Sequence, residues 1–311
     1  MLCFDKLKIV TSTKNIKYFD ENNFEAIFKN RKLQYYKYKQ TIPCELLILI
    51  NYEKDELVIE FTSKISGVSF LELINEETIT SCLLSIKPFL EFNKPIRTML
   101  NYFDVLKCDV TKDVYYNDVS ELERYVKSNL SNYDKWKCEK YRGGFVLKNV
   151  VKTSRYKKRL IIYDKEKEVQ KVKNKEIVEK LNFDGLVEES FSNTVRFEMN
   201  INTKVQIRNL LKIADNKLTN VLTSQANPIL DLLNEVLKEI PVNSAISTLK
   251  MFQYDAVLKI CDYDLSKVEA EFRSRASKNT SITKVMKPYR ELYQRLQNNK
   301  EPAFDIRKLV E

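Results

Sequence analysis

Residues 194–201 alternate strictly between polar and apolar side chains, and this pattern limits the chain to folds that contain a half-buried β-strand. The apolar residues, which point to one side of such a strand, are Val195, Phe197, Met199 and Ile201. The polar residues on the other side are Thr194, Arg196, Glu198 and Asn200. Arg196 and Glu198 are therefore neighbours on one sheet face. They belong either to a charged site or to an ordinary exposed ion pair, which stabilises a protein little.

A second strand is expected at residues 160–163, which are β-branched, aliphatic and aromatic. It follows a polar turn at residues 153–154. Between the turn and the strand lies the densest group of cations in the chain, which comprises Arg155, Lys157, Lys158 and Arg159. Phosphates would be attracted to these cations because each neutralised phosphate releases counterions. This basic segment is a candidate nucleic-acid contact.

Strands are expected in the first two-thirds of the chain and helices in the last third. In residues 105–113, alternation places Lys107, Asp109, Thr111 and Asp113 on one face. Other strand-like stretches are 5–10, 33–39, 46–50, 57–61 and 145–151, and helical periodicity covers 205–213, 227–240, 246–261, 265–276 and 283–296. We expect an α+β fold, with an antiparallel sheet of about five strands flanked by helices, and with strands 105–113 and 194–201 adjacent and central. The change of pattern predicts an α+β domain at residues 1–201 and a helical domain at residues 202–311.

The chain contains no histidine and only four glycines among its 311 residues. This composition excludes a His general base, a Ser-His-Asp triad, a His-ligated metal, and the Gly-rich loops of Walker-type ATPases and Rossmann dehydrogenases. No apolar run reaches the roughly 18 residues that span a bilayer, and the first residues lack a signal-peptide pattern. Six scattered cysteines are typical of reduced thiols. We therefore expect a cytoplasmic protein without a membrane partner.

The charge balance favours a polyanionic partner. The chain has 53 Lys and Arg residues against 43 Asp and Glu, a net charge of +10. A basic surface attracts polyanions, chiefly nucleic acid. An AT-rich genome, which enriches Lys, Asn, Ile and Tyr, would also raise the charge without such a partner.

A second basic set lies between two of the expected helices. It comprises Arg273, Arg275, Lys278, Lys284, Lys287 and Arg290. Two interpretations stay open: these residues clamp duplex DNA, or they form an ordinary solvated helix face.

The motifs described above also carry a resemblance to a known family. The order Thr153-Ser154, Ile162-Tyr-Asp-Lys165 and Arg196-Phe-Glu198 resembles the replication initiators of small phages and rolling-circle plasmids, the group that includes the filamentous-phage gene II and gene X proteins. The likeness extends upstream to residues 57–63, 70–74 and 105–113, so it covers roughly residues 50–225. It implies a Rep endonuclease-like fold and a protein that binds and nicks its replication origin, with host helicase and polymerase as further partners.

The resemblance also implies a reaction. A tyrosine of such an initiator attacks a DNA phosphodiester, stays linked to the 5′ phosphate and leaves a free 3′-OH, while a divalent cation neutralises the phosphate. Without histidine, only carboxylates, amides and water are left as ligands, which suits Mg²⁺ or Mn²⁺. Asp109 and Glu198 are the first candidates for this role, and Asp113 and Glu60 the second. Arg196, Arg273 and Arg275 join the basic segment as expected DNA contacts.

The expected nucleophile departs from the pattern of the family. The family's tyrosine would fall near residues 149–151, where this chain has none. Tyr156, inside the basic segment, is the first candidate because neighbouring cations favour its phenolate. Tyr163 is the second, and Tyr141 is a further one. The departure leaves an alternative open: a non-catalytic protein on the same scaffold that binds the origin and recruits host enzymes.

Overall fold

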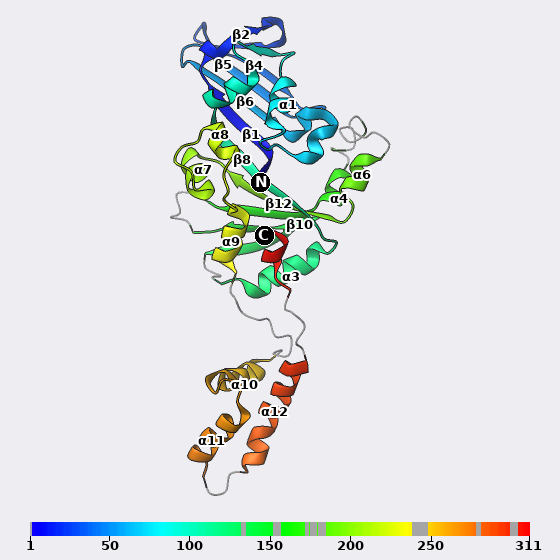
Figure 1. The fold of residues 1–311 in the computed structure, drawn as a ribbon, viewed down its shortest axis with the longest axis vertical. Coiled ribbons are helices and arrows are strands. Elements are labelled where there is room, and N and C mark those ends of the chain that lie inside the picture. The colour runs from blue at the N-terminus through cyan, green and yellow to red at the C-terminus, as the bar shows by residue number, and fades with distance from the viewer. Residues whose placement is uncertain are drawn as a thin grey trace. The chain divides into compact units, whose positions relative to one another are not determined.

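The computed structural model describes residues 2–131, 135–151, 157–171, 174, 179, 185–237, 248–277, 281–298 and 304–311. Its main element is a ten-stranded sheet in which neighbouring strands pair antiparallel (Figure 1). In spatial order the strands are β3 (Glu25–Lys29), β4 (Lys32–Gln40), β5 (Leu46–Asn51), β6 (Glu56–Thr62), β1 (Cys3–Thr11), β8 (Asp104–Tyr115), β12 (Thr194–Ile201), β11 (Arg159–Asp164), β10 (Gly144–Asn149) and β9 (Trp136–Tyr141). The predicted α+β class with an antiparallel sheet is confirmed. The sheet has twice the expected number of strands, and β8 and β12 are adjacent near its middle.

One face of this sheet is apolar, and helices cover it. On β12 the apolar side chains of the alternation, Val195, Phe197, Met199 and Ile201, are all buried. The covering helices include α3 (Val119–Asn129), α7 (Lys204–Leu211), α8 (Leu218–Leu222) and α9 (Pro228–Val236). They pack on β9–β11, on β8 and on β12. Burying these aliphatic and aromatic side chains is the main stabilising term of the unit, at about 1.5–3 kcal/mol for each fully buried one.

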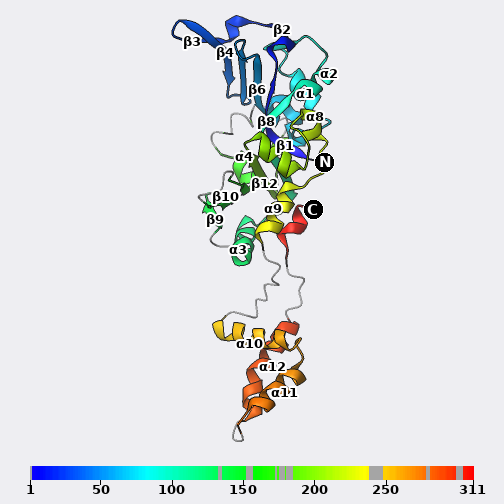
Figure 2. The same ribbon diagram turned by 90° about the vertical axis from the view of Figure 1, so that its left-hand side faces the viewer.

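Among the described residues, short elements cover one end of the other face. They are the 3₁₀ segment η3 (Ser63–Glu72) and the helices α4 (Lys165–Val169) and α6 (Leu186–Ser190). Figure 2 shows α4 on the side of the sheet opposite to α7–α9. Phe70, Val169, Val187 and Phe191 form a small buried cluster beneath these elements. The middle of this face carries mainly polar side chains on β1, β8 and β12, and the whole face is called the polar face below.

A two-stranded sheet adjoins the first strands of the chain. It pairs β2 (Ile16–Phe19) with β7 (Leu90–Phe92), and the helices α1 (Ile79–Leu84) and α2 (Ile96–Met99) flank β7 in sequence. Among the described residues, no helix has the length and the apolar character that crossing a bilayer requires.

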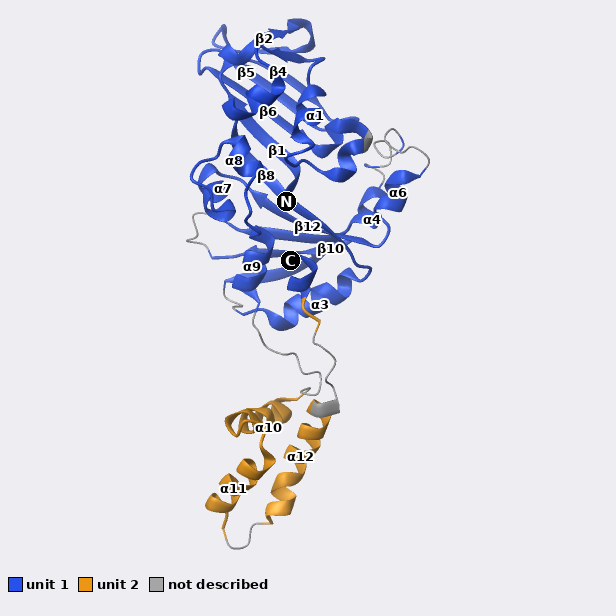
Figure 3. Cartoon of the chain, in the orientation of Figure 1, with its two compact units in different colours: residues 1–238, 306–311 blue, residues 239–305 orange. Residues whose placement is uncertain are grey.

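The chain divides into two compact units (Figure 3). The first comprises residues 1–238 and 306–311, and the second residues 239–305. The expected boundary after residue 201 thus falls inside the first unit, because α7, α8 and α9 pack on the sheet. The second unit holds α10 (Leu249–Ile260), α11 (Leu265–Arg275) and α12 (Ile282–Asn298) around a core of its own that includes Leu258, Val268 and Met286.

Candidate functional site

Three rows of side chains run across the middle of the polar face. The register of β11, β12 and β8 aligns Tyr163 with Arg196 and Asp113. One step along the strands it aligns Ile161 with Glu198 and Thr111. One step further, Asn200 of β12 faces Asp109 of β8, which faces Lys6 of β1. Asp109 and Glu198 therefore lie on the same face of neighbouring strands, as the alternation predicts.

Arg196 is the electrostatic centre of the covered end of this face. Its side chain is only 1% exposed. Nε and Nη2 donate hydrogen bonds of 2.6 Å to the two carboxylate oxygens of Asp113, and Nη1 donates one of 3.0 Å to Oδ1 of Asp5. Although burial opposes the charged form, the carboxylates of Asp113 and Asp5 raise the pKa of Arg196 well above its usual range. A forked guanidinium suits such bidentate pairing.

Asp5 reaches Arg196 because β1 is irregular at this point. The pairing of β1 with β8 shifts register between Phe4 and Lys6, so Asp5 is the extra residue of a bulge. Ser63 Oγ donates a hydrogen bond of 3.2 Å to the same carboxylate. Burial works against ionisation of Asp5, but Arg196 and then Lys165 hold its pKa below the usual value.

Helix α4 adds a second buried ion pair above this end. Asp164 accepts a hydrogen bond from the backbone N–H of Lys167 and thereby caps α4. Lys165, which is buried, lies 2.9 Å from Glu168. Burial and the nearby Arg196 lower the pKa of Lys165. The covered end of the polar face is thus a closed, fully paired network, and its role is to fix β12 against β8, β1 and α4.

Asp109 and Glu198 lie just outside this network. Among the described residues, neither forms an ion pair with a lysine or arginine, and both accept hydrogen bonds from a neutral amide instead. Asn200 Nδ2 donates hydrogen bonds to Oδ1 of Asp109 at 2.8 Å and to Oε1 of Glu198 at 3.1 Å. Burial, followed by the charges of Asp5 and Asp109, raises the pKa of Glu198. The pKa of Asp109 is raised as well, chiefly by burial, although the bond from Asn200 opposes the shift. The two carboxylates form a site of excess negative charge that a bound cation would relieve.

Tyr163 completes this group. Its hydroxyl donates a hydrogen bond of 3.2 Å to Oε2 of Glu198, the oxygen that does not face Asn200. Burial is the main cause of the raised pKa of Tyr163, and the negative charge of Glu198 adds to it. Tyr163, Glu198, Asn200 and Asp109 therefore form one hydrogen-bonded chain, which is called the carboxylate site below.

Two cavities flank the carboxylate site and share Arg159. One, of about 270 Å³, is lined by polar residues that include Lys6, Lys8, Lys107 and Asp109. The other, of about 370 Å³, is lined by Tyr141, Val146, Ile161 and Tyr163, among others.

The cations of these cavities differ in what they pair with. Lys6 and Lys8 bind the Glu60 carboxylate at 2.9 and 3.0 Å, and Lys6 also binds Glu45 at 3.1 Å. Lys107 and Arg159 are exposed, and neither has an ion-pair partner among the described residues. A phosphate that entered beside Asp109 would therefore meet two unpaired cations.

The carboxylate site fits a weakly held hard cation. Asp109 and Glu198 supply oxygen donors, which Mg²⁺ and Mn²⁺ prefer. Burial, and after it the neighbouring carboxylates, raises both pKa values, and a bound cation would favour the charged forms. Within the described part of the chain, no group of three or more carboxylate or thiolate ligands converges on one point. Water and substrate would have to complete the coordination, which is usual for Mg²⁺. Glu60, a second candidate ligand, is held by lysines instead, and Lys6 and Lys8 keep its pKa low despite burial.

Two of the predicted roles on the sheet need correction. Asp113 was expected to hold a metal, but both of its carboxylate oxygens are bound by Arg196. Arg196 was expected to contact DNA, but its guanidinium is buried and its three nitrogens are hydrogen-bonded. Both residues belong to the closed network. The reason is the register, which places Asp113 directly opposite Arg196.

The described residues of the basic segment do not form one continuous surface, because their side chains lie on different sides of the sheet. Arg155 and Tyr156 lie outside the described residues. Lys157 is exposed, and Arg159 lines the polar face. Lys158 alternates to the helix-covered side, where it pairs with Glu235 of α9.

The second basic set is paired with acids where it is described. In α11 Arg273 binds Glu269 and Arg275 binds Glu271, each at 2.7 Å and each four residues apart. Glu269 also forms an ion pair with Arg290 of α12, at 3.2 Å. These contacts favour the solvated helix face over a DNA clamp, because the positive charge is largely balanced on the same surface.

Several residues of the site escaped the sequence analysis. Asn200 was placed on the correct face, but its role depends on Asp109 being opposite. Asp5 shows no signal of its own, because a bulge redirects it. Lys165 and Glu168 lie in a charged stretch that the sequence analysis did not assign to a site, and their spacing of three residues on one helix face was the available signal.

Comparison with known proteins adds no family to this geometry: no protein-family model matches the chain, and no curated protein matches it significantly.

Proposed function

We propose that the protein is a replication initiator of the rolling-circle type, with a Rep endonuclease-like fold, which binds its origin on the polar face and nicks one DNA strand with Tyr163. The observation that carries this proposal is the carboxylate site. There a tyrosine hydroxyl is hydrogen-bonded to a carboxylate, beside the exposed cations Lys107 and Arg159, which have no ion-pair partner in the described part of the chain. The order of motifs in the sequence supports the same function. It implies a cytoplasmic protein whose partners are the origin and host helicase and polymerase.

The proposed reaction exchanges one phosphodiester for another. The hydroxyl oxygen of Tyr163 forms a bond to phosphorus as the bond from phosphorus to the 3′ oxygen breaks. Glu198 Oε2, which already accepts the hydrogen bond from Tyr163, takes the phenol proton. The departing 3′ oxygen takes up a proton and becomes the 3′-OH that a polymerase extends. The products are a 5′-phosphotyrosyl strand and a free 3′ end, with no net oxidation or reduction.

A divalent cation, Mg²⁺ or Mn²⁺, would supply neutralisation of the phosphate charge at this site. Asp109 and Oε1 of Glu198 are the groups that would hold it, since the hydrogen bonds from the one Asn200 amide group show that the two carboxylates lie close together. This leaves Oε2 of Glu198 for Tyr163. Lys107 and Arg159 would bind the neighbouring phosphates of the strand and fix its position.

Two observations favour a second candidate function, an origin-binding protein that does not cut. Burial makes the phenolate of Tyr163 unfavourable, and only two carboxylates converge beside it within the described residues. On this alternative the same face binds the origin, and host enzymes supply the cleavage.

A nicking assay separates the two functions. Purified protein is incubated with a supercoiled plasmid that carries its own gene, with Mg²⁺, with Mn²⁺ or with EDTA. The initiator proposal expects conversion to the open-circular form with metal and none with EDTA or with Glu198→Gln. If the plasmid is bound and retarded on a gel but stays supercoiled with every metal, the non-catalytic function is the correct one.

A further inference from the structure

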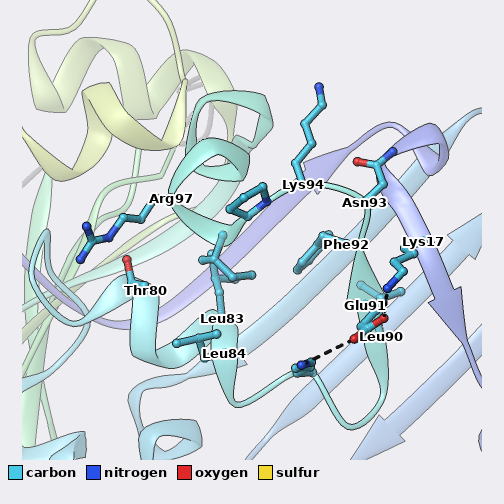
Figure 4. A pocket seen from close by; sticks show the side chains of 13 residues that line it. Lys17, Thr80, Leu83, Leu84, Leu90, Glu91, Phe92, Asn93, Lys94 and Arg97 are labelled. Carbon is cyan, nitrogen blue, oxygen red and sulfur yellow. Dashed lines mark ion pairs between the residues drawn. The ribbon is translucent and has the colours of Figure 1, made fainter.

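A hollow remote from the carboxylate site is built from β7 and the helices on either side of it (Figure 4). Its volume is about 630 Å³. Its accessible apolar lining comes from Leu84, Phe92 and Ile96, above the buried side chains of Leu83 and Leu90. Leu84 is 51% exposed, which is unusual for a leucine beside a buried core. An apolar hollow of this size on the surface is a candidate binding site.

Cations surround this apolar lining and outnumber the acids. Lys17, Lys87, Lys94 and Arg97 line the hollow with one carboxylate, that of Glu91. Glu91 is shared by Lys17 at 3.0 Å and Lys87 at 3.6 Å. Arg97 is exposed and has no ion-pair partner among the described residues. In Figure 4 the side chains of Lys94 and Arg97 extend away from the Lys17–Glu91 pair, on other sides of the hollow. The hollow thus carries surplus positive charge away from Glu91.

The aromatic rings at the hollow are already engaged. Phe92 packs edge-on against Phe103, with ring centroids 5.6 Å apart. Lys94 Nζ lies 3.7 Å from the centroid of the Tyr102 ring, so a cation covers one face of that ring. Single-stranded nucleic acid binds through bases that stack on free ring faces. An aliphatic hollow whose neighbouring rings are engaged suits an apolar side chain better than a base.

We infer that this hollow docks an acidic peptide segment of a partner protein that carries a bulky apolar side chain. The apolar side chain would lie on Leu84, Phe92 and Ile96, which are accessible to solvent. The carboxylates of the peptide would pair with Arg97 and Lys94. Charge complementarity selects this partner, because Arg97 and Lys94 flank the apolar surface away from Glu91 and have no carboxylate partner among the described residues. The inference does not depend on nicking, since no residue of the carboxylate site lines the hollow.

Fluorescence anisotropy with short labelled peptides tests this inference. The probe contains Asp and Glu residues and ends in Phe; one control replaces Phe by Ala, and another replaces the acids by Ser. Only the complete probe is expected to bind wild-type protein. Binding should weaken by about tenfold or more in Arg97→Glu and in Leu84→Glu, as expected for loss of a charge pair or of an apolar anchor. Both positions are exposed, so the fold should tolerate the changes, and Lys107→Ala serves as the matched control with unchanged peptide affinity.

Three results would overturn the inference. The first is equal binding of the Ser control, which would leave the cations without a role. The second is no binding of the complete probe to wild-type protein. The third is displacement of the bound probe by a single-stranded oligonucleotide that still binds Lys107→Ala, which would assign the hollow to nucleic acid.

Discussion

The hydroxyl of Tyr163 on β11 donates a hydrogen bond to Glu198 on β12, although the two residues are not register partners. Tyr163 lies opposite Arg196, and Glu198 lies opposite Ile161. The bond is therefore diagonal, which long side chains on neighbouring strands can reach. The guanidinium of Arg196 is hydrogen-bonded to Asp113 and Asp5. Glu198 therefore forms its hydrogen bonds with Tyr163 and Asn200 instead. The closed network thus determines which carboxylate the tyrosine meets.

Replacing Arg196 by Met should destabilise the first unit strongly. The change leaves the carboxylates of Asp113 and Asp5 without their partner, and breaking a buried pair in this way costs about 3–5 kcal/mol. Urea unfolding followed by circular dichroism measures the loss in free energy of unfolding. Lys32→Met is the matched control, because the Lys32–Glu53 pair is exposed and its loss should cost at most about 1 kcal/mol. Equal effects of the two changes would refute the structural role of Arg196.

Glu198→Gln should stabilise the protein at neutral pH. Burial raises the pKa of Glu198 in the folded state, so the wild type binds this proton more tightly when folded. Wild-type stability from this group is present at low pH and is lost as the pH rises from about 4, the unfolded pKa, through the higher folded pKa. A glutamine at this position does not ionise, so the variant does not lose this stability as the pH rises. Its melting temperature should therefore exceed that of the wild type at pH 7, and the difference should shrink towards pH 3.

Glu168→Gln is a control in the same region, because it should change the melting temperature at pH 7 in the opposite direction. Lys165 holds the pKa of Glu168 below its usual value despite burial. The stability from this carboxylate is present above the unfolded pKa and is lost as the pH falls through the folded pKa. Glu168→Gln should therefore lower the melting temperature at pH 7. A shift of both melting temperatures in the same direction would contradict the opposite pKa shifts of Glu198 and Glu168.

Replacing both Lys107 and Arg159 by Ala should reduce the salt dependence of DNA binding. Each phosphate contact contributes about 0.9 to the slope of log affinity against log salt for duplex DNA, so the slope should fall by roughly 2. Fluorescence anisotropy at several salt concentrations measures it. Replacing both Arg273 and Arg275 by Ala is the matched control and should leave the slope nearly unchanged, because each of these arginines pairs with a glutamate. The reverse result would move the DNA surface to the second unit.

Local patterns predicted the parts of this fold that depend on one strand alone. Alternation placed Asp109, Glu198 and Asn200 on one face, because successive side chains of a strand point to opposite sides. It did not reveal that Arg196 pairs with Asp113, since that contact depends on the register between β8 and β12, which the whole sheet determines. The sequence had left open whether Arg196 and Glu198 belong to a charged site or form an ordinary exposed ion pair with each other. The structure pairs Arg196 elsewhere.

The edges of the fold were the least predictable. β3 and β9, which the sequence analysis missed, are the two edge strands of the sheet. Their sequences carry charged residues at several positions, as edge strands commonly do, and therefore show little apolar alternation. Helices α7 and α9 were predicted near their observed positions but assigned to a separate domain. Their amphipathic pattern shows that each has a buried face, but not which surface covers it.

Mapping the covalent DNA adduct tests the central claim most directly. The protein is incubated with single-stranded DNA of its origin and Mn²⁺ and digested with protease, and the peptide that carries the phosphotyrosyl link is identified by mass spectrometry. Tyr141→Phe is the matched control, because Tyr141 lines the same cavity as Tyr163 without a hydrogen bond to Glu198 among the described residues. Tyr156→Phe tests the candidate that the sequence favours. We predict that the adduct maps to Tyr163, is absent from Tyr163→Phe and persists in Tyr141→Phe and Tyr156→Phe; an adduct on Tyr156, or one that survives in Tyr163→Phe, would contradict the proposed site.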